Sequence, residues 1–181
     1  MDRRRTRVLK PLNNMEFYDD FLNDDEFLEI QNIVLEEIPW FWCTVLRDED
    51  FNSKSDLKNN FQFYHSLYYN NTPESRFYDK FYPIIKRLNI RSLIKMKLNL
   101  NPMTEEIVEH GMHVDYPYQD SKTSIFYLNN NNGYTRLLDG DDEVIVYSVE
   151  NRIVTFDSQT RHTGTTCTDE SRRIVLNINY F

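Results

Sequence analysis

The chain has 181 residues, which is enough for one domain built around a single hydrophobic core. Hydrophobic residues make up 40% of the chain and aromatic residues 14%, so its negative mean hydropathy reflects abundant asparagine and charge rather than disorder. A formal net charge of −8 argues against a nucleic-acid groove, which needs basic surface to displace counterions from phosphates, and favours a peptide or small-molecule partner.

The N-terminal part predicts a basic arm followed by a helix. Residues 1–14 carry the main basic cluster, which we interpret as a solvated arm without a role, and residues 15–181 as one domain. Asn23 is a good N-cap, and Glu26 stands three residues later as in a capping box. A helix from about Asp24 to Glu37 follows, with an apolar stripe at helical spacing formed by Phe27, Ile30, Val34 and Ile38.

The next segment predicts a strand, a loop and a second helix. Pro39 ends the first helix, and the aromatic run 40–42 is expected to open a strand with its indoles in the core. Residues 47–60 are polar and indicate a loop. The run 72–74 (Thr-Pro-Glu) is typical of a helix start, and Pro83 must kink or restart that helix.

From Ile94 onward the apolar period changes to two, which predicts strands. Residues 94–101 alternate apolar and polar side chains, as in a half-buried strand. Further short runs are expected at 123–128, 134–138, 144–148, 152–156, 162–166 and 173–181. The turn-rich segments 129–133 and 139–142 supply the positive-φ positions that tight connections need. The predicted fold is mostly β with flanking N-terminal helices, a jelly roll with its core at about 92–181.

Composition also bears on location and origin. Cys43 and Cys167 are too few and too far apart for a disulfide framework, so a reducing cytoplasm is expected. We see neither a signal peptide nor about 18 consecutive apolar residues, so no membrane contact is expected. Alanine is absent while Asn, Lys, Ile, Tyr and Phe abound, a bias that suggests a viral or otherwise AT-rich genome.

Three residues form a candidate iron site. His113 and Asp115 are two residues apart, so in an extended segment both side chains leave the same face and can reach one metal. His162 lies in a later strand and is the candidate for the third ligand. Two histidines and one carboxylate with open coordination positions are typical of non-heme Fe(II) oxygenases. We assign neither His65 nor His110 to iron.

These residues resemble the Fe(II)- and 2-oxoglutarate-dependent oxygenases, in particular the prolyl-hydroxylase-like branch and its phage-encoded relatives. The motifs are His113-Val-Asp-Tyr-Pro, Ser-Ile-Phe-Tyr127-Leu-Asn, His162-Thr-Gly and Arg173-Ile-Val-Leu-Asn-Ile-Asn-Tyr-Phe. The resemblance implies a double-stranded β-helix, iron held by His113, Asp115 and His162, and 2-oxoglutarate and O2 as cosubstrates. It also implies that Tyr127 and an arginine of the last strand bind the cosubstrate.

The buried C5 carboxylate of 2-oxoglutarate needs a charged, ideally bidentate partner, and Arg172 and Arg173 are both available. Neighbours on a strand point to opposite faces, so only one can enter the barrel. We favour Arg173, because its face carries Asn177 and Asn179, whereas the opposite face is apolar and should pack against the helices. Asn101 stands where the resembling branch often has a tyrosine near the cosubstrate, so we assign it no contact. Thr123 is a weaker candidate for lining the pocket, and Cys167 is expected to be a buried, inert thiol.

The implied reaction is hydroxylation of a substrate C–H bond with release of succinate and CO2. An aspartate at position 115, rather than Gly or Ala, favours hydroxylation over halogenation. The resemblance implies a peptidyl proline or another protein side chain as substrate, with the 47–71 segment as a lid. Two alternatives remain open: a cupin-like metal enzyme that does not use 2-oxoglutarate, and a non-catalytic jelly-roll binding or virion-associated protein. The sequence does not define the oligomeric state.

Overall fold

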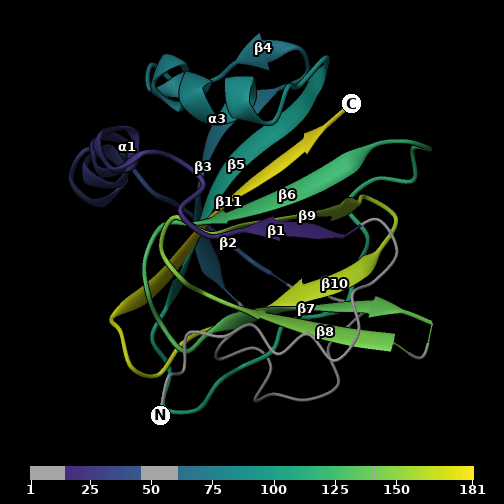
Figure 1. The fold of residues 1–181 in the computed structure, drawn as a ribbon. Coiled ribbons are helices and arrows are strands. Elements are labelled where there is room, and N and C mark those ends of the chain that lie inside the picture. Colours follow the sequence, from purple (N-terminus) through teal and green to yellow (C-terminus); the bar gives the residue numbers. More distant parts are fainter. Residues whose placement is uncertain (1–14, 46–60, 141) are drawn as a thin grey trace.

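A large antiparallel sheet organises the molecule (Figure 1). The computed structural model describes residues 15–45, 61–140 and 142–181. The strand order of the large sheet is β1-β9-β6-β11-β5-β3-β2, with β4 paired to β3. Its strands are β1 (Glu16–Tyr18), β2 (Phe41–Cys43), β3 (Gln62–Tyr69), β4 (Thr72–Pro73), β5 (Leu93–Pro102), β6 (Lys122–Tyr127), β9 (Ile153–Asp157) and β11 (Arg172–Tyr180).

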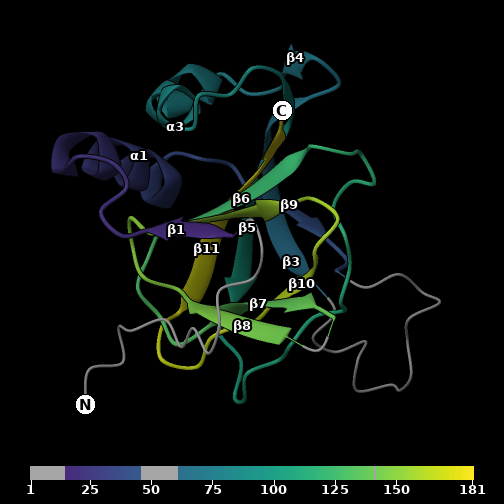
Figure 2. The same cartoon turned by 45° about the vertical axis from the view of Figure 1, so that its right-hand side comes forward.

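A smaller sheet faces the large one. It consists of β10 (Arg161–Gly164), β7 (Tyr134–Asp139) and β8 (Asp142–Tyr147), all antiparallel. In Figures 1 and 2 this sheet lies on one side of the large sheet, and the helices lie on the other. Two facing antiparallel sheets of this kind form a jelly roll, as predicted.

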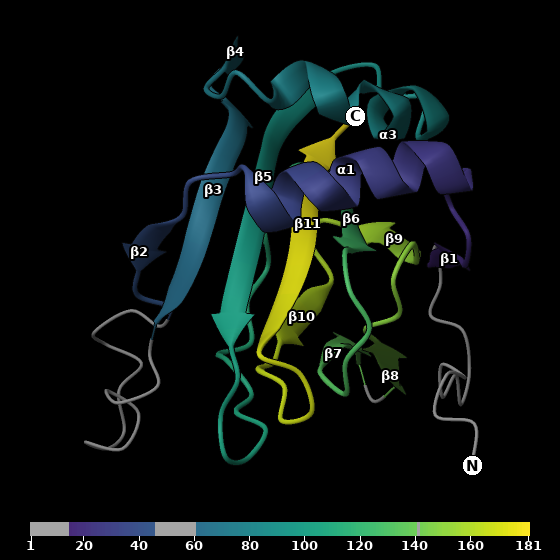
Figure 3. The same ribbon diagram turned by 90° about the vertical axis from the view of Figure 1, so that its left-hand side faces the viewer.

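Helices cover the outer face of the large sheet (Figure 3). Helix α1 (Asp24–Glu36) begins where predicted, with the side chain of Asn23 accepting a hydrogen bond from the Glu26 amide. A 3-10 turn, η2 (Tyr78–Phe81), continues into α3 (Tyr82–Arg87). The main core fills the space beneath these helices and includes Ile30, Phe81, Leu98 and Leu176.

A second, smaller core lies between the two sheets. It is formed by Ile125, Tyr127, Leu137, Val144, Val146, Val154, Phe156 and Val175. These residues come from both sheets and hold them together at one part of the barrel. The remaining space between the sheets is a cavity with many polar and charged side chains in its lining.

Most of the predicted strands are observed with small shifts at their ends, but four expectations were wrong. Residues 72–74 begin the short strand β4 rather than a helix, because Thr72 and Pro73 pair with the end of β3; the helix starts at Tyr82, where Pro83 occupies its first turn. Of the two indoles expected in the core, Trp40 packs against the main core, but Trp42 is 61% exposed, because β2 is an edge strand of the sheet. Gly140 has a positive φ, as predicted, whereas no residue of 129–133 does.

The fourth wrong expectation concerns the proposed lid at 47–71, since Gln62–Tyr69 form strand β3 within the sheet. The predicted arm at 1–14 and the loop at 47–60 lie outside the described residues. Among the helices that are described, none combines the length and the apolar character needed to cross a bilayer.

Candidate metal centre

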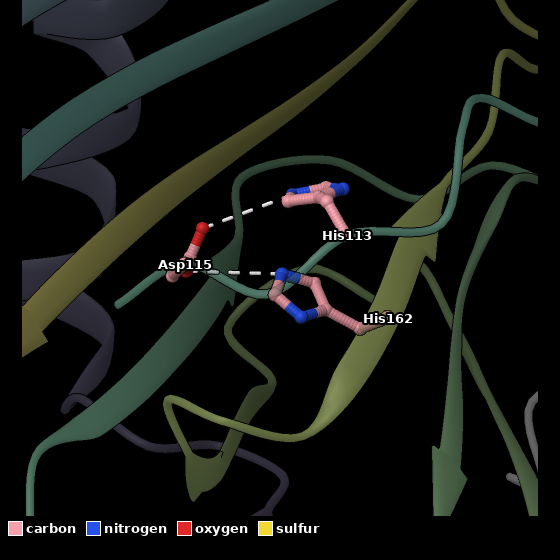
Figure 4. A group of neighbouring side chains, drawn as sticks. All are labelled: His113, Asp115 and His162. Atoms are coloured by element: carbon pink, nitrogen blue, oxygen red, sulfur yellow. Dashed lines mark ion pairs between the residues drawn. The ribbon is translucent and has the colours of Figure 1, made fainter. Parts of the chain in front are cut away.

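The backbone brings the three predicted ligands together. His113 and His162 form an isolated antiparallel bridge, in which each amide donates to the other residue's carbonyl oxygen, at 3.0 and 2.9 Å. The Asp115 amide donates to the carbonyl of Ser158 at 3.2 Å and so holds the same segment beside β9. As a result the potential ligand atoms of His113, Asp115 and His162 lie within 4.8 Å of one another (Figure 4).

Both imidazoles are oriented by backbone carbonyls. Nδ1 of His113 lies 3.0 Å from the carbonyl oxygen of Gly111, and Nδ1 of His162 lies 3.0 Å from that of Thr160. A carbonyl oxygen can only accept, so each Nδ1 carries the proton and donates it. The lone pair of each Nε2 is then free, and each Nε2 lies 3.7 Å from a carboxylate oxygen of Asp115. This is the tautomer that a metal-binding histidine needs.

Asp115 is held by three donors on one of its oxygens. Oδ2 accepts hydrogen bonds from Thr123 Oγ1, Asn177 Nδ2 and Asn179 Nδ2, at 3.0, 3.1 and 2.9 Å. Burial alone would raise the pKa of Asp115, but His162 and the two amide donors outweigh it and hold that pKa below its ordinary value. The carboxylate therefore stays charged, and its Oδ1 has no such donors to compete with a metal.

The centre is closed on one side and open on the other. The side chains of His162 and Asp115 are only 4% and 10% exposed, whereas that of His113 is 53% exposed. Burial lowers the pKa of His162, with Asp115 opposing the shift, so this imidazole is readily neutral as a ligand must be. Two histidines and a carboxylate, open toward His113, fit a non-heme Fe(II) ion with free coordination positions.

Arg173 lies in the same cavity, at the start of β11. Its side chain is 2% exposed and is held by the hydroxyls of Ser148 and Thr135, at 2.8 and 3.1 Å, and by the Thr165 carbonyl at 3.4 Å. No carboxylate of the described residues pairs with it. A buried, unpaired guanidinium is costly, so an anionic ligand is the natural partner at this position. Arg172 is directed to the other face, as its partial exposure shows.

Tyr127 lies beside Arg173 in the interior. It is fully buried, its hydroxyl donates to Thr135 Oγ1 at 2.9 Å, and its ring centroid is 5.7 Å from the Arg173 guanidinium carbon. Thr135 thus links Tyr127 to Arg173. The role of Tyr127 as a cosubstrate ligand stays a prediction.

Gly133 makes room for the arginine. A Cβ atom at this position would lie 2.6 Å from Arg173 Cδ and 2.6 Å from the Thr166 carbonyl oxygen. Any larger residue would therefore have to displace the arginine or the backbone. The sequence had suggested a turn function for this glycine; its small size beside Arg173 is what the structure requires.

The cavity lined by the three candidate ligands and Arg173 has a volume of about 980 Å³. Its floor includes the inner faces of β5 and β11, which carry polar side chains in rows: Asn101 lies opposite Arg173, Asn99 opposite Val175, and Lys97 opposite Asn177. Asn101, to which the sequence assigned no contact, is only 3% exposed and lines the cavity. Thr123, the predicted lining residue, is not among the lining residues and instead donates a hydrogen bond to Asp115. Sequence reasoning did not identify Lys97, Thr135, Ser148 or Gly133, although the alternation of the β5 segment placed Lys97 on the same face as Asn101.

The other candidates fall outside the metal centre. His65 is buried and bonded to the Pro39 carbonyl and to Ser75 Oγ, so it is a structural histidine. His110 lines the cavity but does not belong to the metal-binding group; burial, Arg173 and His113 lower its pKa to about 4. Cys167 is buried and its thiol donates to the Glu170 carbonyl, as expected of an inert cysteine.

Comparison with known proteins supports the fold. Neither a protein-family model nor a curated protein matches the chain. Among solved structures, a prolyl hydroxylase of Trichoplax adhaerens in complex with a hypoxia inducible factor peptide fragment is similar over 93% of this chain and 84% of its own, with 14% identity and a TM-score of 0.64. A Pseudomonas putida prolyl-4-hydroxylase is similar over 92% and 91%, with 14% identity and a TM-score of 0.62.

A third similar structure is the alpha ketoglutarate dependent epimerase SnoN from nogalamycin biosynthesis, which matches over 93% of this chain and 77% of its own, with 13% identity and a TM-score of 0.65. The chain therefore has the jelly-roll fold of 2-oxoglutarate- and iron-dependent oxygenases, including prolyl hydroxylases. The phage-like branch and the viral origin stay predictions, and folds alone do not define substrates.

Proposed function

We propose that the chain is an Fe(II)- and 2-oxoglutarate-dependent dioxygenase that hydroxylates a C–H bond of its substrate, with release of succinate and CO2. The observation that carries this proposal is the pairing of two features in one cavity: a ready facial triad and a buried arginine without a carboxylate partner among the described residues. When bound, ferrous iron and 2-oxoglutarate supply the activation of dioxygen. The protein supplies position and charge.

Each residue has a separate task in this proposal. His113, Asp115 and His162 hold the iron on one face and leave the opposite positions free. Asn177, Asn179 and Thr123 fix the Asp115 carboxylate through hydrogen bonds. Mutation of such supporting residues typically lowers metal affinity by about 10- to 100-fold. Arg173 receives the C5 carboxylate of 2-oxoglutarate at the closed end of the cavity, with Tyr127 beside it.

The spacing along β11 suits this assignment. Arg173 and Asn177 lie on the same face of the strand, four residues apart, which corresponds to about 13 Å at roughly 3.3 Å per residue. One end of this stretch holds the arginine, and the other holds the amides that bind Asp115. In this proposal 2-oxoglutarate bridges the space between the metal centre and the arginine.

The alternatives account for less of the structure. A cupin-like enzyme without 2-oxoglutarate does not need a buried arginine that Gly133, Thr135 and Ser148 accommodate. A binding protein does not need two imidazoles whose Nδ1 protons are committed to backbone carbonyls. An aspartate ligand at position 115 further supports hydroxylation over halogenation.

The substrate is a separate question. A peptide and small molecules occur in the names of the similar structures, which include a prolyl hydroxylase with a peptide fragment and the epimerase SnoN with nogalamycin RO. A peptidyl proline, expected from the sequence resemblance, is one candidate.

The proposed function is tested by turnover of the cosubstrate. We expect slow, Fe(II)-dependent and O2-dependent conversion of 2-oxoglutarate to succinate even without substrate, measured by mass spectrometry. His162→Ala should abolish it, whereas Lys86→Met, at an exposed position on α3, should leave it unchanged. Equal succinate formation by wild type and His162→Ala would refute the proposal.

A further inference from the structure

Lys97 occupies a position next to the metal centre that the proposed reaction does not use. It lies on the inner face of β5, directly opposite Asn177 of β11, and residues opposite each other on antiparallel strands have side chains within about 5 Å at Cβ. Asn177 in turn donates to the ligand Asp115 at 3.1 Å. Lys97 therefore sits one side chain away from the metal ligand, on the floor of the same cavity.

Lys97 has no anionic partner in the described part of the chain. Its nearest recorded contact is the ring of Tyr64, with the ammonium nitrogen 5.9 Å from the ring centroid. Burial, followed by the charge of Lys95, lowers the pKa of Lys97 to about 8, with Cys43 and Asp115 opposing the shift, so the side chain is still mostly charged at neutral pH. Lys97 is partly buried, and an ammonium group without an ion-pair partner in such a position is costly unless a ligand compensates it.

Among the described residues that line the cavity, basic side chains outnumber acidic ones. The basic residues are Lys95, Lys97, Arg161 and Arg173, and the acidic ones are Glu109 and Asp115. Glu109 is already paired with Arg136, and Asp115 is committed to the metal centre. This excess is notable in a chain whose formal net charge is −8.

Iron and 2-oxoglutarate do not remove this excess. One carboxylate of 2-oxoglutarate meets Arg173, and the other, together with Asp115, balances the double charge of Fe(II). Lys97 and Lys95 then remain without a counter-charge. The cavity is therefore complementary to one more anionic group, at the level of the metal.

Unpaired acceptors lie along the same floor. The side-chain oxygens of Asn99, Asn101 and Asn177 are buried, and none of them has a hydrogen-bond partner among the described residues. The residues Asn101 and Asn177 are only 3% and 8% exposed. Buried polar atoms in folded proteins are nearly always paired, so these oxygens indicate bound hydroxyl, amino or water donors. A volume of about 980 Å³ is within the range of pockets that enclose a whole small molecule.

We propose that Lys97 binds a carboxylate or phosphate group of a small substrate and thereby presents that substrate to the metal centre. The inference rests on the proposed function, since it names the substrate class of that same site. It makes a small anionic molecule with hydroxyl or amino donors the substrate, in place of a neutral prolyl peptide. Lys97 is then a specificity-determining residue, and Lys95 adds to the positive field.

The test uses the protein with Zn(II) in place of iron and saturating 2-oxoglutarate, at constant ionic strength. The probes are acetate, its neutral analogue acetamide, inorganic phosphate, and a capped Gly-Asp-Gly peptide. Binding is followed by the NMR signal of the Lys97 side-chain ¹³Cε. We expect acetate or phosphate to bind at least about tenfold more tightly than acetamide. A single partly buried ion pair can supply a difference of this size.

Two variants make the result specific. Lys97→Met should lose the preference for the anion, measured by competition in a thermal shift assay, whereas Lys86→Met should keep it. The affinity for 2-oxoglutarate should be the same in both variants and in wild type, within about threefold. Acetate favoured over phosphate would indicate a carboxylate substrate, and the reverse a phosphorylated one; either supports the proposal.

Three outcomes would overturn the proposal while the proposed function stands. The first is equal binding of acetamide and acetate. The second is binding of the aspartyl peptide alone, without binding of acetate or phosphate. The third is a loss of 2-oxoglutarate affinity of more than about tenfold in Lys97→Met, which would make the lysine a cosubstrate ligand. Failure of the proposed function looks different: wild type would then bind 2-oxoglutarate no better in the presence of the metal than in its absence.

Discussion

The two faces of β11 carry different tasks on nine consecutive residues. The outer face packs under the helices through Ile174, Leu176, Ile178 and Tyr180. The inner face carries Arg173, Val175, Asn177 and Asn179. The two asparagines donate hydrogen bonds to Asp115, and Arg173 is buried without a carboxylate partner among the described residues. The difference teaches that one strand supports the fold with alternate residues and positions the chemistry with the others, so the two should separate in experiments.

The outer face should show the largest effect, on stability. Leu176 is completely buried in the core beneath the helices. Leu176→Ala should lower the free energy of unfolding by about 2–5 kcal/mol, through lost apolar contact and the cavity left behind. Urea denaturation measures it, and the folded fraction should bind metal like wild type. A loss of metal affinity at unchanged stability would contradict the separation of the two faces.

The inner face at Arg173 should show the opposite behaviour. Arg173→Met removes a buried charge that has no carboxylate partner among the described residues, so the free energy of unfolding should stay within about 1 kcal/mol of wild type or rise. The affinity for 2-oxoglutarate should fall by roughly 30-fold or more, as expected when one partner of a buried charge pair is removed. Arg172→Met, on the other face, is the matched control and should bind 2-oxoglutarate normally.

Asn179 should act on the metal rather than on the cosubstrate. Its side chain donates to Asp115 Oδ2 and to Thr123 Oγ1, both at 2.9 Å. Asn179→Ala should therefore weaken metal binding by about 10- to 100-fold, measured by competition with a chelator. The Km for 2-oxoglutarate at saturating iron should change far less. An unchanged metal affinity would show that Asp115 does not depend on this support.

Gly133 offers the smallest and most local change. Gly133→Ala places a methyl group 2.6 Å from Arg173 Cδ and 2.6 Å from the Thr166 carbonyl oxygen, so both the arginine side chain and the backbone at Thr166 have to shift. We expect a loss of about 1 kcal/mol, equivalent to about fivefold, in 2-oxoglutarate affinity, with intact metal binding. Gly140→Ala, at a turn with open space around it, is the control for cosubstrate binding, although its φ of +62° will cost some stability.

Local patterns were sufficient for much of this architecture. The alternation in 173–181 assigned the two faces of β11 and placed Asn177 and Asn179 in the interior, and the spacing of His113 and Asp115 placed both on one side of an extended segment. The third ligand, His162, required only that a later strand return to the same region. Such patterns depend on side-chain period, which the sequence displays directly.

Other features depended on contacts between distant segments. Strand β3 was overlooked because its aromatic run, Gln62–Tyr69, follows a polar stretch that indicated a loop. The exposure of Trp42 follows from the edge position of β2, which composition does not reveal. The role of Gly133 follows from Arg173, forty residues later, and the unpaired charge of Lys97 becomes visible only once the lining of the cavity is known.

The central claim is that the inner face of β11 and the three ligands form one Fe(II) and 2-oxoglutarate site, and anaerobic absorption spectroscopy tests it most directly. The wild-type protein with Fe(II) and 2-oxoglutarate should show a visible charge-transfer band, which His162→Ala should lose and Arg173→Ala should weaken. The Leu176→Ala variant, below its unfolding transition, should keep the band. A well-folded wild-type protein without the band would contradict the account.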